Sequence, residues 1–223
     1  MPVRSVPFVS GEIYHVFNRG INKQTIFKTN KDFFRALETL KYYPYKDPPL
    51  RYSQFLNLPK DIKSDVMKKL LSKDKLIEVI SYCLMPNHFH FLLRQIKANG
   101  VQDLVRKFEI SYTRFFNTKY SGIGPILQGQ FKAVRIEDEN QLLHVSRYIH
   151  LNPYSSYLIS KLEDIEDYRW SSLPEYLTKK AGHFCSRDLL LSHFKNEMKY
   201  KEFIFNQADY QRKLKLIDHL ILE

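Results

Sequence analysis

Two apolar runs separated by a short turn constrain the fold of this chain more than any other feature. Residues 76–83 and 88–94 are rich in aliphatic, β-branched and aromatic side chains, and Met, Pro and Asn occupy positions 85–87 between them. Pro and Asn are common turn residues, so this pattern predicts a β-hairpin. Because strand side chains alternate between two faces, the imidazoles of His88 and His90 should point to the same side.

Other periodic segments flank the hairpin in a definite order. Residues 13–18 alternate weakly, as a strand does, and a helical pattern begins at residue 30 and should end before Pro44. After the hairpin, apolar residues recur at helical spacing over residues 101–116, and residues 131–136 predict a further strand. The order strand, helix, strand, strand, helix, strand is that of the ferredoxin-like, or split βαβ, fold. We therefore expect an α+β protein with an antiparallel sheet, helices on one face, and the first and third strands at the centre.

Three segments extend beyond this six-element pattern. A Lys-rich stretch at residues 47–75 contains one short helical pattern and indicates an insertion. A seventh element, a helix over residues 138–151, should be closed by Pro153, because proline disrupts a helix interior. The remaining residues are helical and basic in pattern. We therefore predict a main domain at residues 1–153 and a helical extension at residues 154–223.

The composition favours a nucleic-acid partner. The 223 residues include 35 Lys and Arg against 24 Asp and Glu, which gives a formal charge of +11 and a pI near 9.5. Such an excess favours a polyanion. No apolar stretch approaches the roughly 20 residues of a membrane span, and no signal-peptide pattern is visible, so we expect a cytoplasmic protein without a membrane partner. Cys83 and Cys185 form neither a metal-binding nor a disulfide pattern, which agrees with a reducing compartment.

A polar stripe on the predicted seventh element carries candidate chemistry. His144, Tyr148 and Asn152 recur every four residues and so share one helix face. If this face meets the His-bearing side of the hairpin, His88, His90 and the Asn152 carbonyl could bind a divalent cation with open coordination positions. A tyrosine hydroxyl beside such a cation is a candidate nucleophile for phosphodiester cleavage.

Each of these residues also has a structural interpretation. His15 and His144 fit hydrogen-bonded structural or surface residues better than metal ligands. Asn152 precedes a proline and could simply end the helix. Tyr148 is favoured among the fifteen tyrosines because it has a polar partner four residues later. No general base can be named, because the neighbours of Tyr148 in sequence face other directions on a helix.

Five motifs occur in a fixed order between residues 13 and 153. They are YHVFNRG at 14–20, YCLMPNHFH at 82–90, YTRFFN at 112–117, QGQFK at 128–132 and RYIHLNP at 147–153, with a weaker echo, WSS, at 170–172. In this order they resemble the single-tyrosine HUH transposases of the insertion sequence 200/605-like superfamily, in particular those associated with repetitive extragenic palindromes in bacteria. The resemblance implies the ferredoxin-like fold and makes residues 1–153 the catalytic domain.

The resemblance also implies a chemistry. In such enzymes the two histidines and a polar residue four positions after the tyrosine bind Mg²⁺ or Mn²⁺, which assigns His88, His90 and Asn152 as metal ligands. The tyrosine, here Tyr148, attacks single-stranded DNA and keeps it as a 5′-phosphotyrosine, so rejoining needs no ATP. The implied partner is single-stranded DNA with a hairpin or palindromic repeat, in the nucleoid of a bacterial cytoplasm. Relatives include dimers and monomers, so both a homodimer and a monomer stay open.

Basic and polar residues in or near the motifs are the expected DNA contacts, since Lys and Arg neutralise phosphates. These residues are Arg19, Arg114, Lys119, Gln130, Lys132 and Arg135. Gln130 departs from the family pattern, in which an Arg commonly precedes the Phe of this segment. The insertion and the tail exceed the minimal catalytic domain, so the resemblance assigns them no function.

Two other functions stay open at this point. One is a non-catalytic, single-stranded nucleic-acid-binding module of the RNA-recognition type, whose aromatic side chains on the first and third strands stack on bases. The third strand offers Phe89 and Phe91 opposite the histidines, where helices could bury them. The other is a metallohydrolase that activates water, a chemistry for which an acidic ligand is more typical.

Overall fold

The computed structural model describes residues 7–178 and 183–221, and the side chains of residues 215–221 are not considered. The chain divides into two compact units. Unit 1 comprises Met1–Glu78, Pro86–His88 and Leu93–Arg135, and unit 2 comprises Val79–Met85, Phe89–Leu92 and Ile136–Glu223. Both strands of the predicted hairpin therefore contribute residues to both units.

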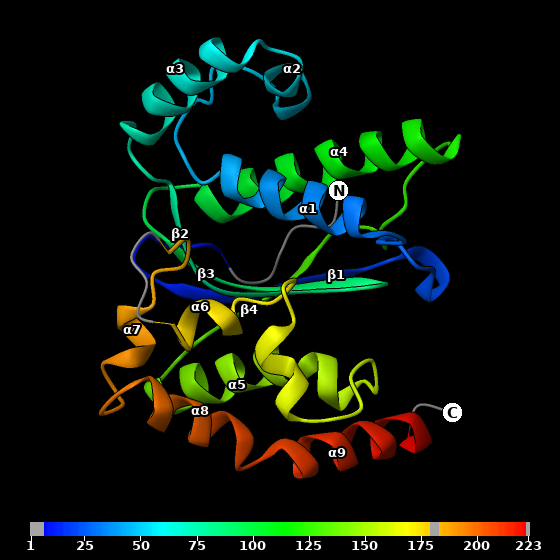
Figure 1. Ribbon diagram of the computed structural model, residues 1–223, viewed down its shortest axis with the longest axis vertical. Coiled ribbons are helices and arrows are strands. Elements are labelled where there is room, and N and C mark those ends of the chain that lie inside the picture. Colours follow the sequence, from blue (N-terminus) through cyan, green and yellow to red (C-terminus); the bar gives the residue numbers. More distant parts are fainter. Residues whose placement is uncertain (1–6, 179–182, 222–223) are drawn as a thin grey trace. The chain divides into compact units, whose positions relative to one another are not determined.

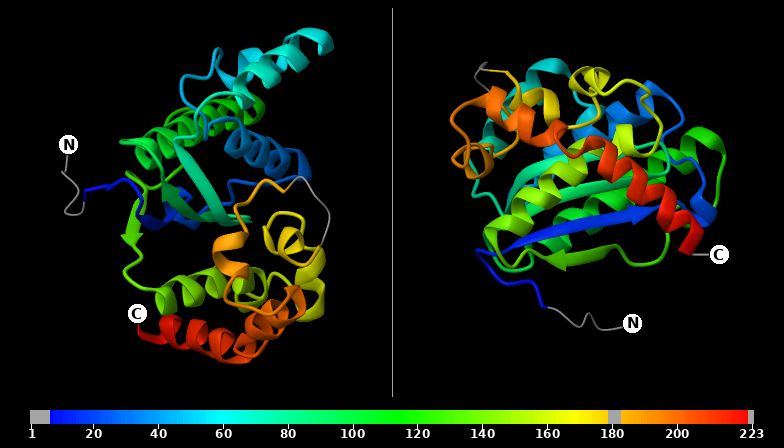
Figure 2. Two further views of the ribbon diagram at one scale, coloured as in Figure 1. Left: turned by 90° about the vertical axis from the view of Figure 1, so that its left-hand side faces the viewer. Right: turned by 90° about the horizontal axis from the view of Figure 1, so that it is seen from below.

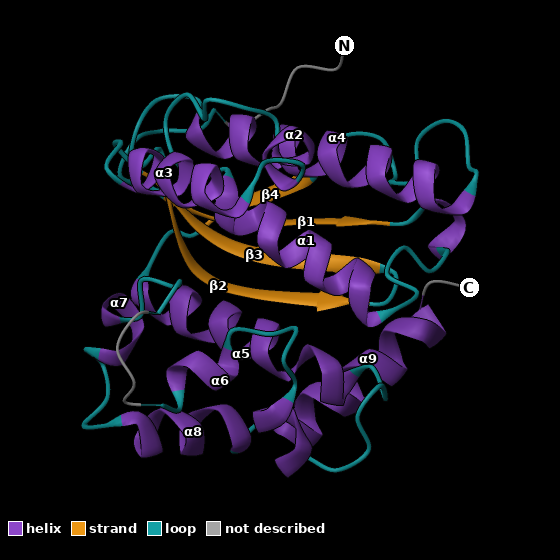
Figure 3. Cartoon of the chain, turned by 45° about the horizontal axis from the view of Figure 1, so that its top comes forward, coloured by secondary structure: helices purple, strands orange, loops and turns teal. Residues whose placement is uncertain are grey.

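Four strands form one sheet in the order β2-β3-β1-β4 (Figure 3). The strands are β1 (Ile13–Arg19), β2 (Ile77–Met85), β3 (His88–Gln95) and β4 (Lys132–Arg135). The first and third strands are the central pair, as the split βαβ order predicts. The α+β class and the antiparallel sheet are confirmed, whereas the placement of the helices on one face stays a prediction.

Strand β1 shows how unit 1 obtains one layer of its core. Tyr14, Val16 and Asn18 are buried, whereas His15 and Phe17 between them are partly exposed. A period of two is expected when one face of a strand packs against the interior. The neighbouring strand β4 runs antiparallel to β1, with residue pairs from 14 opposite 135 to 17 opposite 132.

Helices α1 (Asn30–Tyr42) and α4 (Gly100–Tyr120) pack against each other in unit 1 (Figure 1). A short 3-10 turn, η1 (Ile21–Lys23), precedes α1. At the start of α1, the backbone N–H of Thr29 donates to the carboxylate of Asp32 at 2.9 Å. This contact satisfies a donor that the first helical turn leaves without an intrahelical acceptor. Both helices occur where the sequence predicts them, and α4 continues one turn further.

The insertion forms two helices, α2 (Tyr52–Leu56) and α3 (Lys60–Leu71), where the sequence predicted one. Helix α2 buries Tyr52 and Phe55, which lie three residues apart. A helix of five residues is too short to show a periodicity, which explains why it was missed. The periodic pattern that predicted α3 does not mark a buried stripe, because Ile62 is 43% exposed and among the residues of α3 only Leu70 is buried.

Helix α5 (Glu139–Ser155) is the predicted seventh element. The side chain of Asp138 accepts a hydrogen bond from the backbone N–H of Gln141 at 2.7 Å and caps its first turn. The prediction that Pro153 closes the helix is wrong, because α5 continues to Ser155. Proline removes one helical hydrogen bond, and the burial of residues 152–155 stabilises the last turn against this local cost.

The tail is helical, as its pattern predicts. Its elements are η2 (Glu163–Asp167), α6 (Leu173–Tyr176), α7 (Asp188–Leu191), α8 (Glu197–Phe205) and α9 (Ala208–Ile221). Helices α8 and α9 pack along α5 within unit 2 (Figure 2). The predicted division after residue 153 falls inside α5 and stays a prediction. None of the helices in the described ranges is long and apolar enough to cross a membrane.

The WSS segment pairs with strand β2 within unit 2. The backbone N–H of Leu84 donates to the carbonyl of Trp170 at 2.8 Å, and the N–H of Ser172 donates to the carbonyl of Tyr82 at 2.9 Å. Cys83 and Ser171 face each other between these bonds in an antiparallel bridge. The weak echo of the family motifs therefore marks a short added partner for the edge strand of the sheet.

Candidate active site

A tyrosine and a histidine that the sequence analysis identified meet in unit 2. The ring of Tyr148 on α5 lies edge-on to the imidazole of His90 on β3, with ring centroids 5.3 Å apart and planes at 89°. His90 is 6% exposed, whereas Tyr148 is partly exposed. Tyr148 is therefore less enclosed by the protein than His90.

Asn152 lies one helical turn after Tyr148 on α5 and is fully buried. Residues four apart share a helix face, so the amide lies on the side of α5 that carries the phenol. The backbone carbonyl of Asn152 accepts hydrogen bonds from the N–H of Ser156 at 3.0 Å and its hydroxyl at 2.7 Å. Because the helix continues past this position, the interpretation of Asn152 as a helix terminator is wrong.

His88 stands at the start of β3, in unit 1, and a neighbouring amide fixes its tautomer. Its Nδ1 is 2.6 Å from Oδ1 of Asn87. A carbonyl oxygen only accepts hydrogen bonds, so Nδ1 carries the proton and the lone pair lies on Nε2. The Asn87 amide is itself oriented, because Nδ2 donates to the carbonyl of Lys23 at 3.2 Å. An oriented acceptor behind the ring is typical of histidines that bind metals through the other nitrogen.

Gly20 allows the loop after β1 to hold the turn before His88. Its backbone N–H donates to the carbonyl of Asn87 at 2.8 Å. A Cβ atom at this position would lie 2.3 Å from the carbonyl oxygen of Gln24 and 2.9 Å from the side chain of Ile26. Glycine is therefore required by close approach, which gives the Arg-Gly pair of the first motif a structural role.

The donor set fits the expected cation. His88, His90 and Asn152 offer two imidazoles and one amide oxygen, ligands that divalent cations such as Mg²⁺ and Mn²⁺ accept. The tautomer of His88 agrees with such a role. Within the described ranges, no group of three or more His, Cys, Asp and Glu residues could hold a metal ion.

His150 anchors α5 and cannot act as a base for Tyr148. It is fully buried, with Nε2 at 2.8 Å from the hydroxyl of Ser172 and Nδ1 at 2.9 Å from the hydroxyl of Tyr200. Burial lowers the pKa of His150 to about 3, so the ring is neutral at physiological pH. Its two hydrogen bonds join α5 to the WSS segment and to α8.

Arg147 and His144 join α5 to α8 as well. The Arg147 guanidinium donates to Nδ1 of His144 at 2.6 Å and to the carbonyl of Phe203 at 3.3 Å, and it lies 4.2 Å above the Phe203 ring. Burial lowers the pKa of Arg147 from its ordinary value. These contacts support the structural interpretation of His144.

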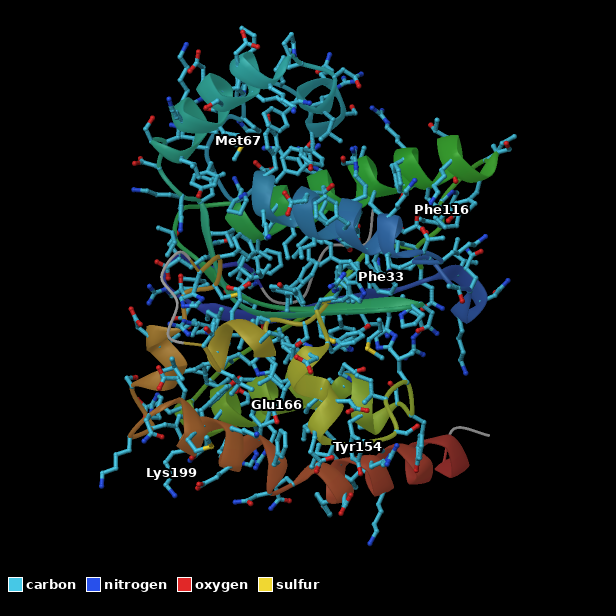
Figure 4. All side chains as sticks on the ribbon, in the orientation of Figure 1. Phe33, Met67, Phe116, Tyr154, Glu166 and Lys199 are labelled. Carbon is cyan, nitrogen blue, oxygen red and sulfur yellow. The ribbon has the colours of Figure 1, made fainter. Side chains whose placement is uncertain are left out.

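Helix α9 contacts the part of α5 that carries Tyr148. The side chain of Gln211 donates to the backbone carbonyl of Tyr148 at 3.2 Å and to the hydroxyl of Ser155 at 3.4 Å. Further along α5, the hydroxyl of Tyr154 (Figure 4) donates to the carboxylate of Asp209 at 2.9 Å. Neighbouring residues of the tail therefore hold α5 at two successive turns.

The aromatic residues of the sheet do not form a base-stacking platform. Phe89 and Phe91 are both fully buried and stack on each other with centroids 4.5 Å apart. On β1, Phe17 packs beside His15 with ring centroids 5.0 Å apart. Burial lowers the pKa of His15 to about 4, which agrees with a structural role. The RNA-recognition alternative needs exposed aromatic rings on these strands and therefore loses its main support.

The expected DNA-contacting residues are all exposed in unit 1. Arg135 on β4 pairs with Glu12 at 2.9 Å, and Arg114 extends from α4. The exposed residues of the predicted set are Arg19, Arg114, Lys119, Gln130, Lys132 and Arg135. Their contact with DNA stays a prediction.

Lys119 is engaged within the protein. Its Nζ lies 2.6 Å from a carboxylate oxygen of Asp32, which also accepts a hydrogen bond from the Tyr120 hydroxyl at 2.7 Å. Burial alone would raise the pKa of Asp32, but these bonds and two backbone N–H groups hold it below its usual range. Lys119 thus stabilises the start of α1, and a role in DNA binding for this residue stays a prediction.

Sequence reasoning missed two residues that support the site. Asn87 had a visible signal, because it is a polar residue directly before His88 in a motif. Gln211 had none, because it lies 63 positions from Tyr148 in a tail that no motif covers. Its role depends on how α9 packs along α5.

Comparisons with known proteins concern the family resemblance and the fold. Residues 51–152 match the family model for "Transposase IS200 like". A solved structure of a REP-associated tyrosine transposase bound to a REP hairpin has the same fold, with a TM-score of 0.54 and 14% identity over 83% of this chain and 94% of that chain. No curated protein matches the sequence. Residues 51–152 are therefore similar to the IS200-like transposases, which agrees with the resemblance that the motifs predicted.

Proposed function

We propose that this protein cleaves and rejoins single-stranded DNA next to a hairpin through a covalent bond to Tyr148. The contact between the Tyr148 ring and the His90 imidazole, at 5.3 Å between centroids, carries the proposal. In this contact a candidate nucleophile lies beside one of the two histidines of the HUH motif. The partial exposure of Tyr148 agrees with attack on an external substrate.

His88, His90 and Asn152 would hold Mg²⁺ or Mn²⁺. The bound cation would withdraw charge from a phosphate oxygen. The hydrogen bond from His88 to Asn87 keeps Nε2 of His88 in the form that can act as a ligand. Burial of His90 and Asn152 limits the number of orientations that their side chains adopt.

The covalent step conserves the energy of the broken bond. The phenol of Tyr148 loses its proton, its oxygen forms a bond to phosphorus, and the bond from phosphorus to the 3′ oxygen breaks. The released 3′ oxygen takes up a proton, and the 5′ phosphate stays on the tyrosine. Rejoining is the reverse attack by a 3′ hydroxyl, so no nucleotide cofactor is needed.

The proposed substrate follows from the charge of the protein and from its family resemblance. A formal charge of +11 favours a polyanion, and the related structure contains a REP hairpin. Exposed Arg19, Lys132 and Arg135 would contact phosphates and position the strand. The Gln130 amide would contact the same backbone as a neutral hydrogen-bond donor.

A denaturing gel tests the proposal directly. The protein is incubated with Mn²⁺ and 3′-labelled single-stranded DNA that carries a hairpin, and a covalent protein–DNA band is measured. We expect this band with the wild type, its complete loss in Tyr148→Phe, and a loss of at least about a hundredfold in His88→Ala.

Tyr210→Phe is the matched control, because it makes the same chemical change at a tyrosine of α9 that is 61% exposed. It should keep the wild-type yield of adduct. Cleavage without a covalent band would show that water is the nucleophile, and an adduct that persists in Tyr148→Phe would assign a different tyrosine. Either result contradicts the proposal.

A further inference from the structure

A groove in unit 1 lies outside the residues of the candidate active site. It has a volume of about 940 Å³. It is lined by residues of the insertion between positions 47 and 57, by residues of α4, and by Arg35 and Tyr43. The insertion, to which the resemblance assigned no function, therefore forms a surface shared with the motif-bearing helix α4.

The groove carries an excess of positive charge. Asp47 is the one acidic residue in its lining, as far as the described residues show. Asp103, close by, lies 3.4 Å from Arg106 and 4.0 Å from Lys107, so one carboxylate is shared by two cations. The cationic residues of the lining are Arg35, Arg51, Arg106, Lys107 and Arg114. Such a surface attracts an anion.

Arg35 contributes a cation that packs between two aromatic rings. Its guanidinium lies 4.6 Å from the Tyr52 ring and 5.3 Å from the Phe115 ring. Its Nε is buried and has no hydrogen-bond partner among the described residues, and burial lowers the pKa of the group. Aromatic faces hold a guanidinium plane while its edge stays able to donate to an anion. Because a buried donor without an acceptor costs free energy, an anionic ligand that accepts from Nε would stabilise this arrangement.

The shape of the cationic surface indicates a chain of phosphates. Arg106, Ile110 and Arg114 recur every four residues and share one face of α4, over about 12 Å of helix. A row of this length can contact more than one phosphate along a strand. A single small anion would use only one end of the row.

Apolar and aromatic groups in the groove indicate unpaired bases. Ile110 is 46% exposed and Leu56 is 38% exposed, and both line the groove with the partly exposed Phe115. Proteins that bind single strands combine a basic groove with such contacts to base faces. A duplex would bury its bases away from these side chains.

We propose that this groove binds single-stranded DNA and is a second nucleic-acid site, built by the insertion and α4. The choice of DNA rests on the proposed transposase function. The binding itself needs neither the cation nor Tyr148. The groove therefore holds a part of the strand that is not the one being cleaved, which lengthens the DNA that the protein recognises.

Fluorescence anisotropy with a labelled oligothymidine, without divalent cations, tests this site apart from cleavage. We expect the double variant Arg51→Glu/Arg114→Glu to bind at least about tenfold more weakly than the wild type, with a shallower dependence on salt. The matched control is Lys68→Glu/Lys69→Glu, which makes the same charge change at exposed positions of α3 in the same insertion. It should lose less than about threefold.

Equal losses in the two double variants would overturn the proposal, because only net charge would then matter. A hairpin without single-stranded ends that binds as tightly as oligothymidine, and loses as much in the groove variant, would assign a duplex instead. A polyglutamate peptide that binds the wild type more tightly than oligothymidine would assign an acidic protein partner. All four positions that are changed are exposed, and thermal melts verify that both variants fold.

The two proposals fail separately. Absence of a covalent adduct in the wild type, with oligothymidine binding still lost in the groove variant, contradicts the transposase chemistry and leaves a single-strand-binding groove. An adduct in the wild type with unchanged binding in the groove variant contradicts the groove alone.

Discussion

The two longest helices, α4 and α5, use their surfaces in different ways. Helix α4 presents the exposed side chains of Arg106, Ile110 and Arg114 to an open groove. Helix α5 buries all residues from 149 to 155 and is bonded to the tail through His150 and other side chains. The contrast teaches that the C-terminal half of the helix that carries the candidate nucleophile is enclosed, whereas one face of α4 stays open.

This difference has a physical reason. A nucleophile must be held in a narrow range of positions, since a shift of about 1 Å can cost a hundredfold in rate. Contacts from Arg and Lys to phosphates tolerate movement, because the charge acts over several ångströms and the side chains are long. A fixed α5 and an open α4 are therefore the arrangement expected if one helix reacts and the other binds.

The largest predicted effect is on the fixed side of the comparison. His150→Ala removes the hydrogen bonds to Ser172 and Tyr200 and leaves a buried cavity, so we expect a loss of about 3 kcal/mol in the free energy of unfolding. Arg106→Ala on the open face of α4 should change it by less than about 0.5 kcal/mol. Urea titrations measure both. Similar values for the two variants would break the contrast between the helices.

The second prediction sharpens the comparison at the end of α4. Lys119→Met removes a partner from the buried carboxylate of Asp32, so we expect a loss of about 2 kcal/mol in the free energy of unfolding. Lys107→Met, on the same helix but beside the groove, should cost less than about 0.5 kcal/mol while weakening DNA binding. If Lys119→Met instead leaves stability intact and weakens DNA binding, Lys119 belongs to the open surface.

The third prediction concerns pH. The folded pKa of His150 lies near 3 and that of His15 near 4, against ordinary values of 6.5. Between these values the unfolded chain binds more protons, so stability falls as the pH falls below 6.5, by up to about 1.4 kcal/mol per pH unit for each ring. The carboxylate of Asp32, whose pKa is also lowered, loses its contribution only as the pH falls below its ordinary 3.8.

Unfolding free energies measured from pH 7 to pH 3 distinguish these two ranges. His150→Gln should roughly halve the slope between pH 6.5 and pH 4, because His15 still contributes there. Asp32→Asn should leave this slope unchanged and flatten the lower range. A profile that is flat between pH 6.5 and pH 4 in the wild type would mean that the buried histidines are not neutral groups of the folded interior.

The smallest predicted effect tests how α9 supports α5. Gln211→Ala removes hydrogen bonds to the Tyr148 carbonyl and the Ser155 hydroxyl, so we expect a loss of about 1 kcal/mol in stability and a several-fold slower formation of adduct. Gln207→Ala is the control, since Gln207 is exposed just before α9. A change in stability without a change in adduct rate would limit α9 to a structural role.

The elements of the fold could be predicted because each has a local signal. Alternation located β1, the Pro-Asn turn located the hairpin, and helical spacing located α4. The end of α5 could not be predicted in this way, because local preference at Pro153 opposes it and burial by the tail decides it. Helix α2 was missed because one turn of helix contains too few residues for a periodicity.

The candidate site was predictable to a similar extent. The spacing of Tyr148 and Asn152 and the alternation of His88 and His90 identified the residues of the candidate site, and their roles stay predictions. The orientation of His88 by Asn87 depends on Lys23, a residue from another loop. The groove could not be read from the sequence, because Arg35, Tyr52 and Phe115 come from three separate helices.

The pairing of the WSS segment with β2 has a consequence beyond the site. Strand β2 stands at the end of the sheet order, and its backbone would otherwise present donors and acceptors to any other extended peptide. Trp170 and Ser172 of the same chain form backbone hydrogen bonds with these groups. A version shortened to the minimal catalytic region would thus expose the unpaired backbone groups of β2. We expect such a version to aggregate through pairing of these strands.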